Sequence, residues 1–294
     1  MLKRWWPILA IVVLSACGGG GGGDAPVPPA GPPSQKVGEI FSTPAELSTA
    51  ELRTTFGYAG NVATSRAIQQ SGRANILDLL FVTHGGDRAA GVLPTDLDGR
   101  LSAYVAANAD LLVPGVRVLV ADEVFWNPPD NRDDASLLDA QHEALRTAIA
   151  KVRAAIPGAS VGITVTPYAT FERPNTVAAI RRAICLVDWV GTDVYWLGDA
   201  GRIADLHRWS AGFPALARAA NARVEVWYIA QAFRLAEWDL ATFRDFIREE
   251  LVNAAGYDGV LFFGWQFASE ITSAIIGRNF DPQTRALYGG FLTQ

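Results

Sequence analysis

The sequence has few of the residues that build metal centres and disulfide scaffolds. Among its 294 residues are two cysteines and three histidines, and the histidines stand far apart at positions 84, 142 and 207. Such spacing provides no cluster of metal ligands. Two cysteines also exclude a small scaffold held by several disulfides. We therefore expect neither a metal nor another cofactor.

The sequence also lacks the signals of nucleic-acid and nucleotide binding. Its 25 basic residues are outnumbered by 30 acidic residues, for a net charge of −5. A mildly acidic chain gives no electrostatic basis for binding nucleic acid. No Walker motif is present, and no Gly-x-Gly-x-x-Gly follows the first expected strand. Nothing therefore favours a nucleotide-binding sheet.

The N-terminus resembles a lipoprotein signal. Lys3 and Arg4 precede the apolar run Trp5–Leu14, which is too short to span a bilayer core of roughly 30 Å. The following Leu-Ser-Ala-Cys, ending at Cys17, is similar to the lipobox of bacterial lipoproteins. That resemblance implies cleavage before Cys17 and lipidation of its thiol, and Gly18 instead of Asp implies the outer membrane. An ordinary secretory signal is the alternative.

Composition then divides the chain into three parts. Residues 1–16 are the expected signal peptide, and residues 17–35 are the lipidated cysteine with a tether rich in Gly and Pro. Such a tether is flexible or extended and cannot bury a core. Residues 36–294 suit one domain, with no second linker. We expect a monomer anchored through Cys17, on the periplasmic face or the cell surface.

The domain alternates short apolar runs with longer helical patterns. Such alternation predicts βαβ units and a parallel sheet. Eight strands would close a (β/α)₈ TIM barrel, and an open doubly wound sheet is the alternative. The expected strands are 36–42, 57–64, 76–83, 116–126, 160–167, 187–196, 224–233 and 259–267. The clearest expected helix is 135–155, and 65–71, 202–220 and 240–254 are further expected helices.

Polar and aromatic residues gather where these apolar runs end. The carboxyl ends of barrel strands meet at one face, which is where this fold places its chemistry. Carboxylates among aromatic rings suit a carbohydrate, because sugar faces stack on rings and sugar hydroxyls need hydrogen-bond partners. The candidates are His84, Asp122, Glu123, Trp126, Tyr168, Asp193, Tyr195, Trp196, Gln231 and Trp265.

This array resembles the clan A glycoside hydrolases, the (β/α)₈ enzymes that include the cellulase-like family 5. The matching positions are His84, Glu123, Tyr168, Tyr195 and Trp265. Asp122 stands where the family has Asn. The resemblance implies that Glu123 is the general acid/base, acting on a polysaccharide or oligosaccharide at the cell envelope.

One position departs from the family. Gln231 stands where a retaining enzyme carries its nucleophilic carboxylate on strand seven, and glutamine cannot form the glycosyl ester. Asp193, or next Asp122, would then be the second carboxylate, or the substrate would supply its own nucleophile. A barrel that binds glycan without cleaving it would also fit this sequence, and so would a structural envelope lipoprotein without a ligand.

Overall fold

Eight parallel strands form a closed barrel at the centre of the computed structural model, which describes residues 36–84, 86–87, 90–125, 133–166, 173–265 and 274–292. Each strand pairs with the next along the chain, and β9 closes the barrel against β1. This confirms the predicted single-domain (β/α)₈ barrel. The barrel strands are β1 Lys36–Ile40, β2 Phe56–Ala59, β3 Ala74–Asp78, β4 Arg117–Ala121, β5 Ser160–Val165, β6 Trp189–Val194, β7 Glu225–Gln231 and β9 Gly259–Phe263.

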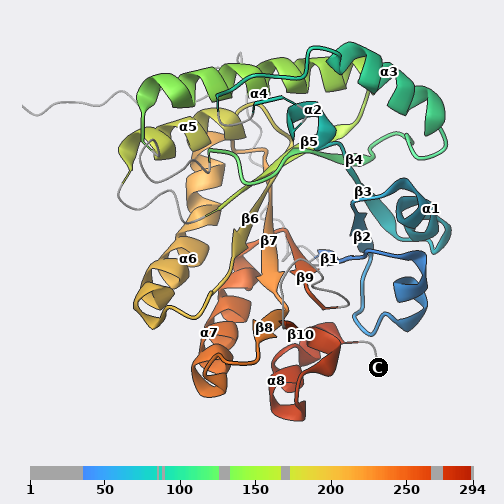
Figure 1. The fold of residues 1–294 in the computed structure, drawn as a ribbon. Helices are drawn as coiled ribbons and strands as arrows, with labels where there is room; N and C mark the ends of the chain where they lie inside the picture. The colour runs from blue at the N-terminus through green and yellow to red at the C-terminus, as the bar shows by residue number, and fades with distance from the viewer. Residues whose placement is uncertain are drawn as a thin grey trace, which may run out of the picture.

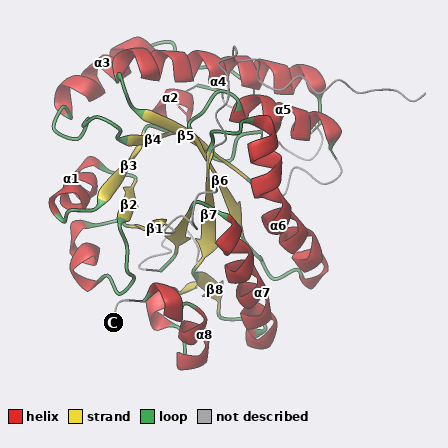
Figure 2. Cartoon of the chain, turned by 180° about the vertical axis from the view of Figure 1, so that it is seen from behind, coloured by secondary structure: helices red, strands yellow, loops and turns green. Residues whose placement is uncertain are grey.

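Helices surround the barrel on its outside (Figures 1 and 2). Several begin at an Asn or Asp whose side chain accepts a backbone N–H of the first turn, as Asn61, Asp134 and Asp239 do. A two-stranded antiparallel ribbon of β8 Phe233–Leu235 and β10 Ala274–Ile276 lies beside the barrel. The helices are α1 Val62–Gln70, α2 Phe81–His84, α3 Leu97–Ala107, α4 Ala135–Ala155, α5 Pro174–Ile184, α6 Ile203–Ala220, α7 Leu240–Asn253 and α8 Pro282–Leu287.

Two tryptophans fill the barrel interior, and glycines on neighbouring strands make room for them. A Cβ at Gly162 of β5 would lie only 1.9 Å from the ring of Trp189 on β6. A Cβ at Gly259 of β9 would lie 2.7 Å from the ring of Trp227 on β7. Both rings are almost completely buried. Gly162 and Gly259 thus make room for the two rings inside the barrel.

A charged cluster lies at the amino-terminal ends of the strands. Glu225 on β7 accepts from Arg117 on β4 at 2.8 Å and pairs with Lys36 on β1 at 2.9 Å. It also accepts the indole N–H of Trp227 at 2.6 Å. The Arg117 guanidinium lies 4.8 Å from the ring centre of Phe56. These contacts join four strands below the tryptophans.

The third strand ends earlier than the sequence predicts. The apolar run 76–83 continues past Asp78, but β3 stops there and residues 81–84 form α2. Asp78 causes this end, because its Oδ1 accepts the N–H of Leu80 at 2.7 Å and turns the chain. The strand-end residue is therefore Asp78 rather than His84. Across the described ranges, no helix combines the length and apolar character needed to cross a membrane.

Candidate active site

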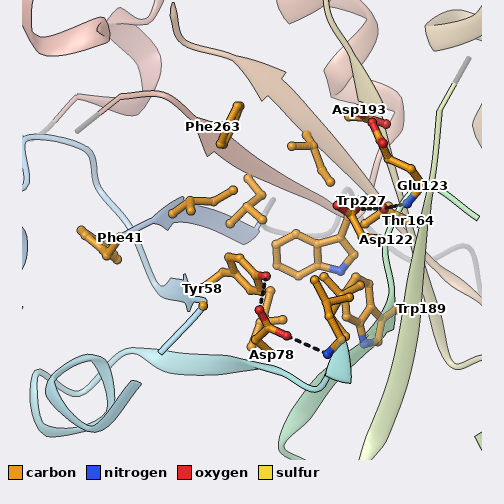
Figure 3. Close-up of a pocket in the computed structure, with 18 of the residues that line it drawn as sticks. Phe41, Tyr58, Asp78, Asp122, Glu123, Thr164, Trp189, Asp193, Trp227 and Phe263 are labelled. Atoms are coloured by element: carbon orange, nitrogen blue, oxygen red, sulfur yellow. Dashed lines mark hydrogen bonds between the residues drawn. The ribbon is translucent and has the colours of Figure 1, made fainter. Parts of the chain in front are cut away.

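A cavity of about 550 Å³ opens at the carboxyl-terminal ends of the strands (Figure 3). Every barrel strand or the loop that follows it contributes to its wall. The lining is aromatic and aliphatic with a small set of carboxylates, which is the usual composition of a small-molecule site. The lining residues are Ile40, Phe41, Ser42, Tyr58, Gly60, Asn61, Ile76, Asp78, Leu80, Leu119, Asp122, Glu123, Thr164, Trp189, Gly191, Asp193, Tyr195, Trp227, Ile229, Leu261 and Phe263.

Aromatic rings form much of this wall. The N–H groups of Trp189 and Trp227 are bonded to the Ser160 carbonyl and to Glu225. Their polar atoms are therefore satisfied, while their rings line the cavity. Tyr195 stacks on Phe263 at 5.6 Å between ring centres. Rings held in this way provide surfaces against which the apolar face of a sugar can stack.

Asp122 and Glu123 both line the cavity although they are neighbours in sequence. Adjacent residues of a regular strand face opposite sides. Here the β4–β5 pairing shifts register between Leu119 and Ala121, and Glu123 adopts a left-handed φ of 47°. Thr164 holds this geometry, because its hydroxyl accepts the N–H of Glu123 at 2.9 Å and donates to Asp122. A strained backbone supported by neighbouring contacts is frequent at functional sites.

The carboxyl groups of Asp193 on β6 and Glu123 both line the cavity. Two carboxylates in close proximity repel each other, which favours the protonated form of one of them. Asp193 is 7 % exposed, and burial, followed by the charges of Glu123 and Asp122, raises its pKa well above the usual range. Figure 3 shows the two carboxyl groups beside each other. The pair is thus a proton-holding unit in the cavity wall.

Asp78 is a fourth carboxylate in the cavity, and it is not among the residues expected from sequence. Its Oδ2 accepts the hydroxyl of Tyr58 at 3.0 Å (Figure 3). Burial is the main cause that raises its pKa, and the charge of Asp122 adds to this effect, while His84 opposes it. The signal that could have found Asp78 is its position as the one charged residue inside the apolar run 76–83.

Gln231, Trp196 and Trp265, which the sequence suggests as site residues, lie outside the lining of this cavity. Gln231 is buried and hydrogen-bonds the N–H and carbonyl of Trp196 and the carbonyl of Phe233. Trp196 packs on Trp238 instead. Trp265 is fully buried, because Gly264, with a φ of 85°, turns the chain so that the indole packs on Tyr288.

The remaining predicted residues divide into three groups. Asp122, Glu123, Asp193 and Tyr195 line the cavity together, as the strand-end positions suggested. His84 is exposed at the end of α2, outside the lining but close enough to influence Asp78. Trp126, Tyr168 and Cys17 lie outside the described residues. A group of three or more His, Cys, Asp or Glu able to hold a metal is absent from the described ranges.

Several aromatic lining residues are also absent from the sequence-based candidates. Trp189 precedes Asp193 by four positions on the same strand, so period-two alternation places both on one face. The same alternation places Trp227 with Ile229 on β7. Inside a near-continuous apolar run such residues resemble core residues, and only the strand ends stand out. Counting back in steps of two from the predicted site residues Asp193 and Gln231 reaches Trp189 and Trp227.

Comparison with known proteins shows the fold. No family model and no curated protein matches this chain. A putative α-L-fucosidase from Bacteroides thetaiotaomicron aligns over 93 % of this chain and 98 % of its own, with 11 % identity and a TM-score of 0.56. A psychrophilic glycoside hydrolase family 10 endo-β-1,4-xylanase aligns over 87 % and 96 %, with 12 % identity and a TM-score of 0.56. GH26C from Muricauda sp. aligns over 83 % and 81 %, with 10 % identity and a TM-score of 0.57. The chain shares its barrel fold with these glycoside hydrolases.

Proposed function

We propose that the protein hydrolyses glycosidic bonds of a polysaccharide or oligosaccharide, with Glu123 as its general acid/base. The adjacent carboxyl groups of Glu123 and Asp193 in the cavity wall carry this proposal (Figure 3). Burial and the neighbouring carboxylates raise the pKa of Asp193, and a protonated carboxyl is what protonation of a glycosidic oxygen needs. Aromatic rings around the pair supply stacking surfaces for sugar, and the barrel is the fold of the glycoside hydrolases described above.

The position of Asp193 beside Glu123 suggests their roles (Figure 3). The two carboxyl groups are proposed to act on the same side of the sugar, with Asp193 as a positioning residue for the Glu123 carboxyl. Asp122, held by Thr164, is then the carboxylate proposed to stabilise the positive charge of the transition state.

Replacing Glu123 by Gln tests the assignment. The amide keeps the size and hydrogen bonding of the side chain but removes the titrating proton. General acid/base catalysis typically contributes 10²–10⁴-fold. We expect the release of reducing ends from a susceptible glycan to fall at least ~100-fold, with glycan affinity largely kept. Equal turnover by Glu123→Gln and the wild type would refute the role of Glu123.

A barrel that binds glycan without cleaving it is the second candidate function. It is favoured by Gln231, which ends β7 where the resembling family carries its nucleophile. The wild-type protein would then bind a glycan at this cavity but release no reducing ends from any glycan in the panel. In either case we propose an envelope lipoprotein anchored at Cys17, supported by the signal-like N-terminal sequence.

A further inference from the structure

The four carboxyl groups of the cavity do not form one cluster. Asp122 and Glu123 follow β4, and the carboxyl group of Asp193 on β6 lies beside that of Glu123 (Figure 3). Asp78 ends β3, and Figure 3 shows it apart from Glu123 and Asp193, next to Tyr58. Strands β4 and β5 lie between β3 and β6 around the barrel. The cavity therefore has carboxyl groups on two sides of the space that a substrate would occupy.

Hydrolysis by a single displacement needs carboxyl groups on two sides of the sugar. One gives a proton to the glycosidic oxygen, and the other takes a proton from the attacking water. Enzymes that invert the anomeric configuration keep the two about 6.5–9.5 Å apart, which leaves room for this water.

The lining from β7 does not favour a double displacement. That reaction needs a nucleophilic carboxylate, which the resembling family carries on strand seven. The described β7 residues that line this cavity are Trp227 and Ile229. Gln231 is bonded to the backbone of Trp196 and Phe233 instead. Asp78, which lies on another strand, is thus the carboxyl group left to act opposite Glu123.

The surroundings of Asp78 suit a base. Its Oδ2 accepts the hydroxyl of Tyr58 at 3.0 Å, and its Oδ1 accepts the N–H of Leu80 at 2.7 Å. A carboxylate oxygen can accept more than one hydrogen bond, so both can still accept from water. Burial raises the pKa of Asp78 and the charge of Asp122 adds to this, whereas Leu80, Tyr58 and the charge of His84 favour its ionised form. A raised pKa makes the carboxylate a stronger base, and these donors keep the form that accepts a proton available.

We propose that Asp78 is the general base of a glycoside hydrolysis that inverts the anomeric configuration, with Glu123 as the general acid. The inference rests on the proposed function and assigns its stereochemical course. The oxygen of water bonds to the anomeric carbon while the bond from that carbon to the glycosidic oxygen breaks. Asp78 takes the proton that the water loses, and Glu123 gives its proton to the departing oxygen. Exchange with solvent then removes the proton from Asp78 and returns one to Glu123.

The configuration of the first product tests this course. The probes are the 4-nitrophenyl α- and β-glycosides of fucose, xylose, mannose and glucose, together with soluble xylan and mannan. Proton NMR of the anomeric hydrogen, recorded before mutarotation, should show the configuration opposite to that of the cleaved bond. A product of retained configuration would overturn the role of Asp78 and keep the hydrolase. No hydrolysis of any probe by the wild-type protein would refute the hydrolase itself, and the role of Asp78 with it.

The variant Asp78→Asn tests the residue. The amide oxygen can still accept the N–H of Leu80, so the turn is kept while the base is lost. We expect kcat on the cleaved probe to fall at least ~100-fold. Azide is an anion that attacks without a base, so it should raise the turnover of the variant about tenfold or more and form a glycosyl azide of inverted configuration. Unchanged turnover, or a loss that azide does not rescue, would overturn the proposal.

Two further variants of the cavity separate the base from its neighbours. Asp122→Asn removes a carboxylate of the same kind, and its loss of turnover should not be rescued by azide. Rescue of Asp122→Asn in place of Asp78→Asn would assign the base to Asp122 and overturn the proposal. Dinitrophenol departs without a proton, so Glu123→Gln should cleave the 2,4-dinitrophenyl counterpart of the probe nearly as fast as the wild type. Asp78→Asn should stay slow on this substrate, and equal recovery of both variants would overturn the proposal.

A surface variant completes the comparison. Asp245→Asn removes an exposed carboxylate that pairs with Arg248 on α7, and it should keep the wild-type turnover and the same response to azide. Thermal unfolding of each variant checks that the barrel is intact.

Discussion

At the scale of single residues, Asp193 links the chemistry of the cavity to the stability of the fold. Its pKa is raised by burial and by the neighbouring charges of Glu123 and Asp122. The folded protein therefore keeps a proton that the unfolded chain releases near pH ~4. As the pH rises from that value through the raised pKa, the folded state binds more protons than the unfolded state, so the free energy of unfolding falls.

The variant Asp193→Asn should reduce this pH dependence. An amide carries no charge at any pH, so the variant should lose less stability than the wild type as the pH rises through this window. Urea unfolding at about pH 5 and about pH 8 measures the difference. Asp245→Asn on the exposed face of α7 is the control and should keep the wild-type slope. An unchanged slope in Asp193→Asn would show that Asp193 is ionised throughout, and the proton-sharing pair would be rejected.

At the scale of elements, the close fit between Gly162 of β5 and Trp189 of β6 leaves no room for a Cβ beneath the Trp189 ring. Trp189 lies over Gly162, where a Cβ would meet its ring at 1.9 Å. Gly162→Ala should therefore force a shift of Trp189 and lower the free energy of unfolding by about 1–3 kcal/mol. Gly212→Ala on the exposed face of α6, where a Cβ meets nothing within 4 Å, should instead raise it by about 0.4–1 kcal/mol.

Denaturant midpoints of the two alanine variants measure these opposite effects. Because Trp189 also lines the cavity, Gly162→Ala should weaken ligand binding as well, whereas Gly212→Ala should leave it unchanged. If Gly162→Ala were as stable as the wild type, Trp189 would be mobile within the barrel. The ring would then be unsuitable as a fixed stacking surface.

The order of elements was predictable from sequence, but the ends of the strands were not. Hydrophobic periodicity identified the barrel because each apolar run is buried on both faces. The end of β3 could not be recognised within the apolar run 76–83, because Leu79 and the first residues of α2 are also buried or partly buried. Only the side-chain bond from Asp78 to Leu80 marks the turn. Periodicity contains no information about such a bond.

The direction of side chains beyond the strand ends could not be predicted from the sequence either. Asp122 and Glu123 share the cavity only because of a register shift and a left-handed residue, both of which depend on tertiary contacts with Thr164. Trp265 was expected at the mouth, but the turn at Gly264 directs it into the core. Position along a strand thus predicts which end of the barrel a residue occupies. It does not predict whether the side chain reaches the cavity.

At the scale of the whole molecule, the two ends of the barrel have different electrostatic character. The amino-terminal end holds Glu225 between Lys36 and Arg117, and these cations lower the pKa of Glu225. The carboxyl-terminal end holds four carboxyl groups with no cation among the described lining residues. The balanced end joins strands and contributes to stability. The carboxyl-terminal end brings the carboxyl groups and the cavity together.

The proposed lipid anchor concerns the placement of this barrel at a membrane. The residues between Cys17 and β1 are rich in Gly and Pro, which is the composition expected of a tether. Several acyl chains on Cys17 would hold the domain at the surface, since each buried CH₂ contributes about 0.8 kcal/mol. We expect the wild-type protein to sediment with membranes and to enter the detergent phase on extraction. Cys17→Ser should appear in the soluble fraction with its ligand binding unchanged, because the cavity lies within the barrel. A Cys17→Ser protein that stays in the membrane pellet with the same detergent requirement would place the anchor elsewhere.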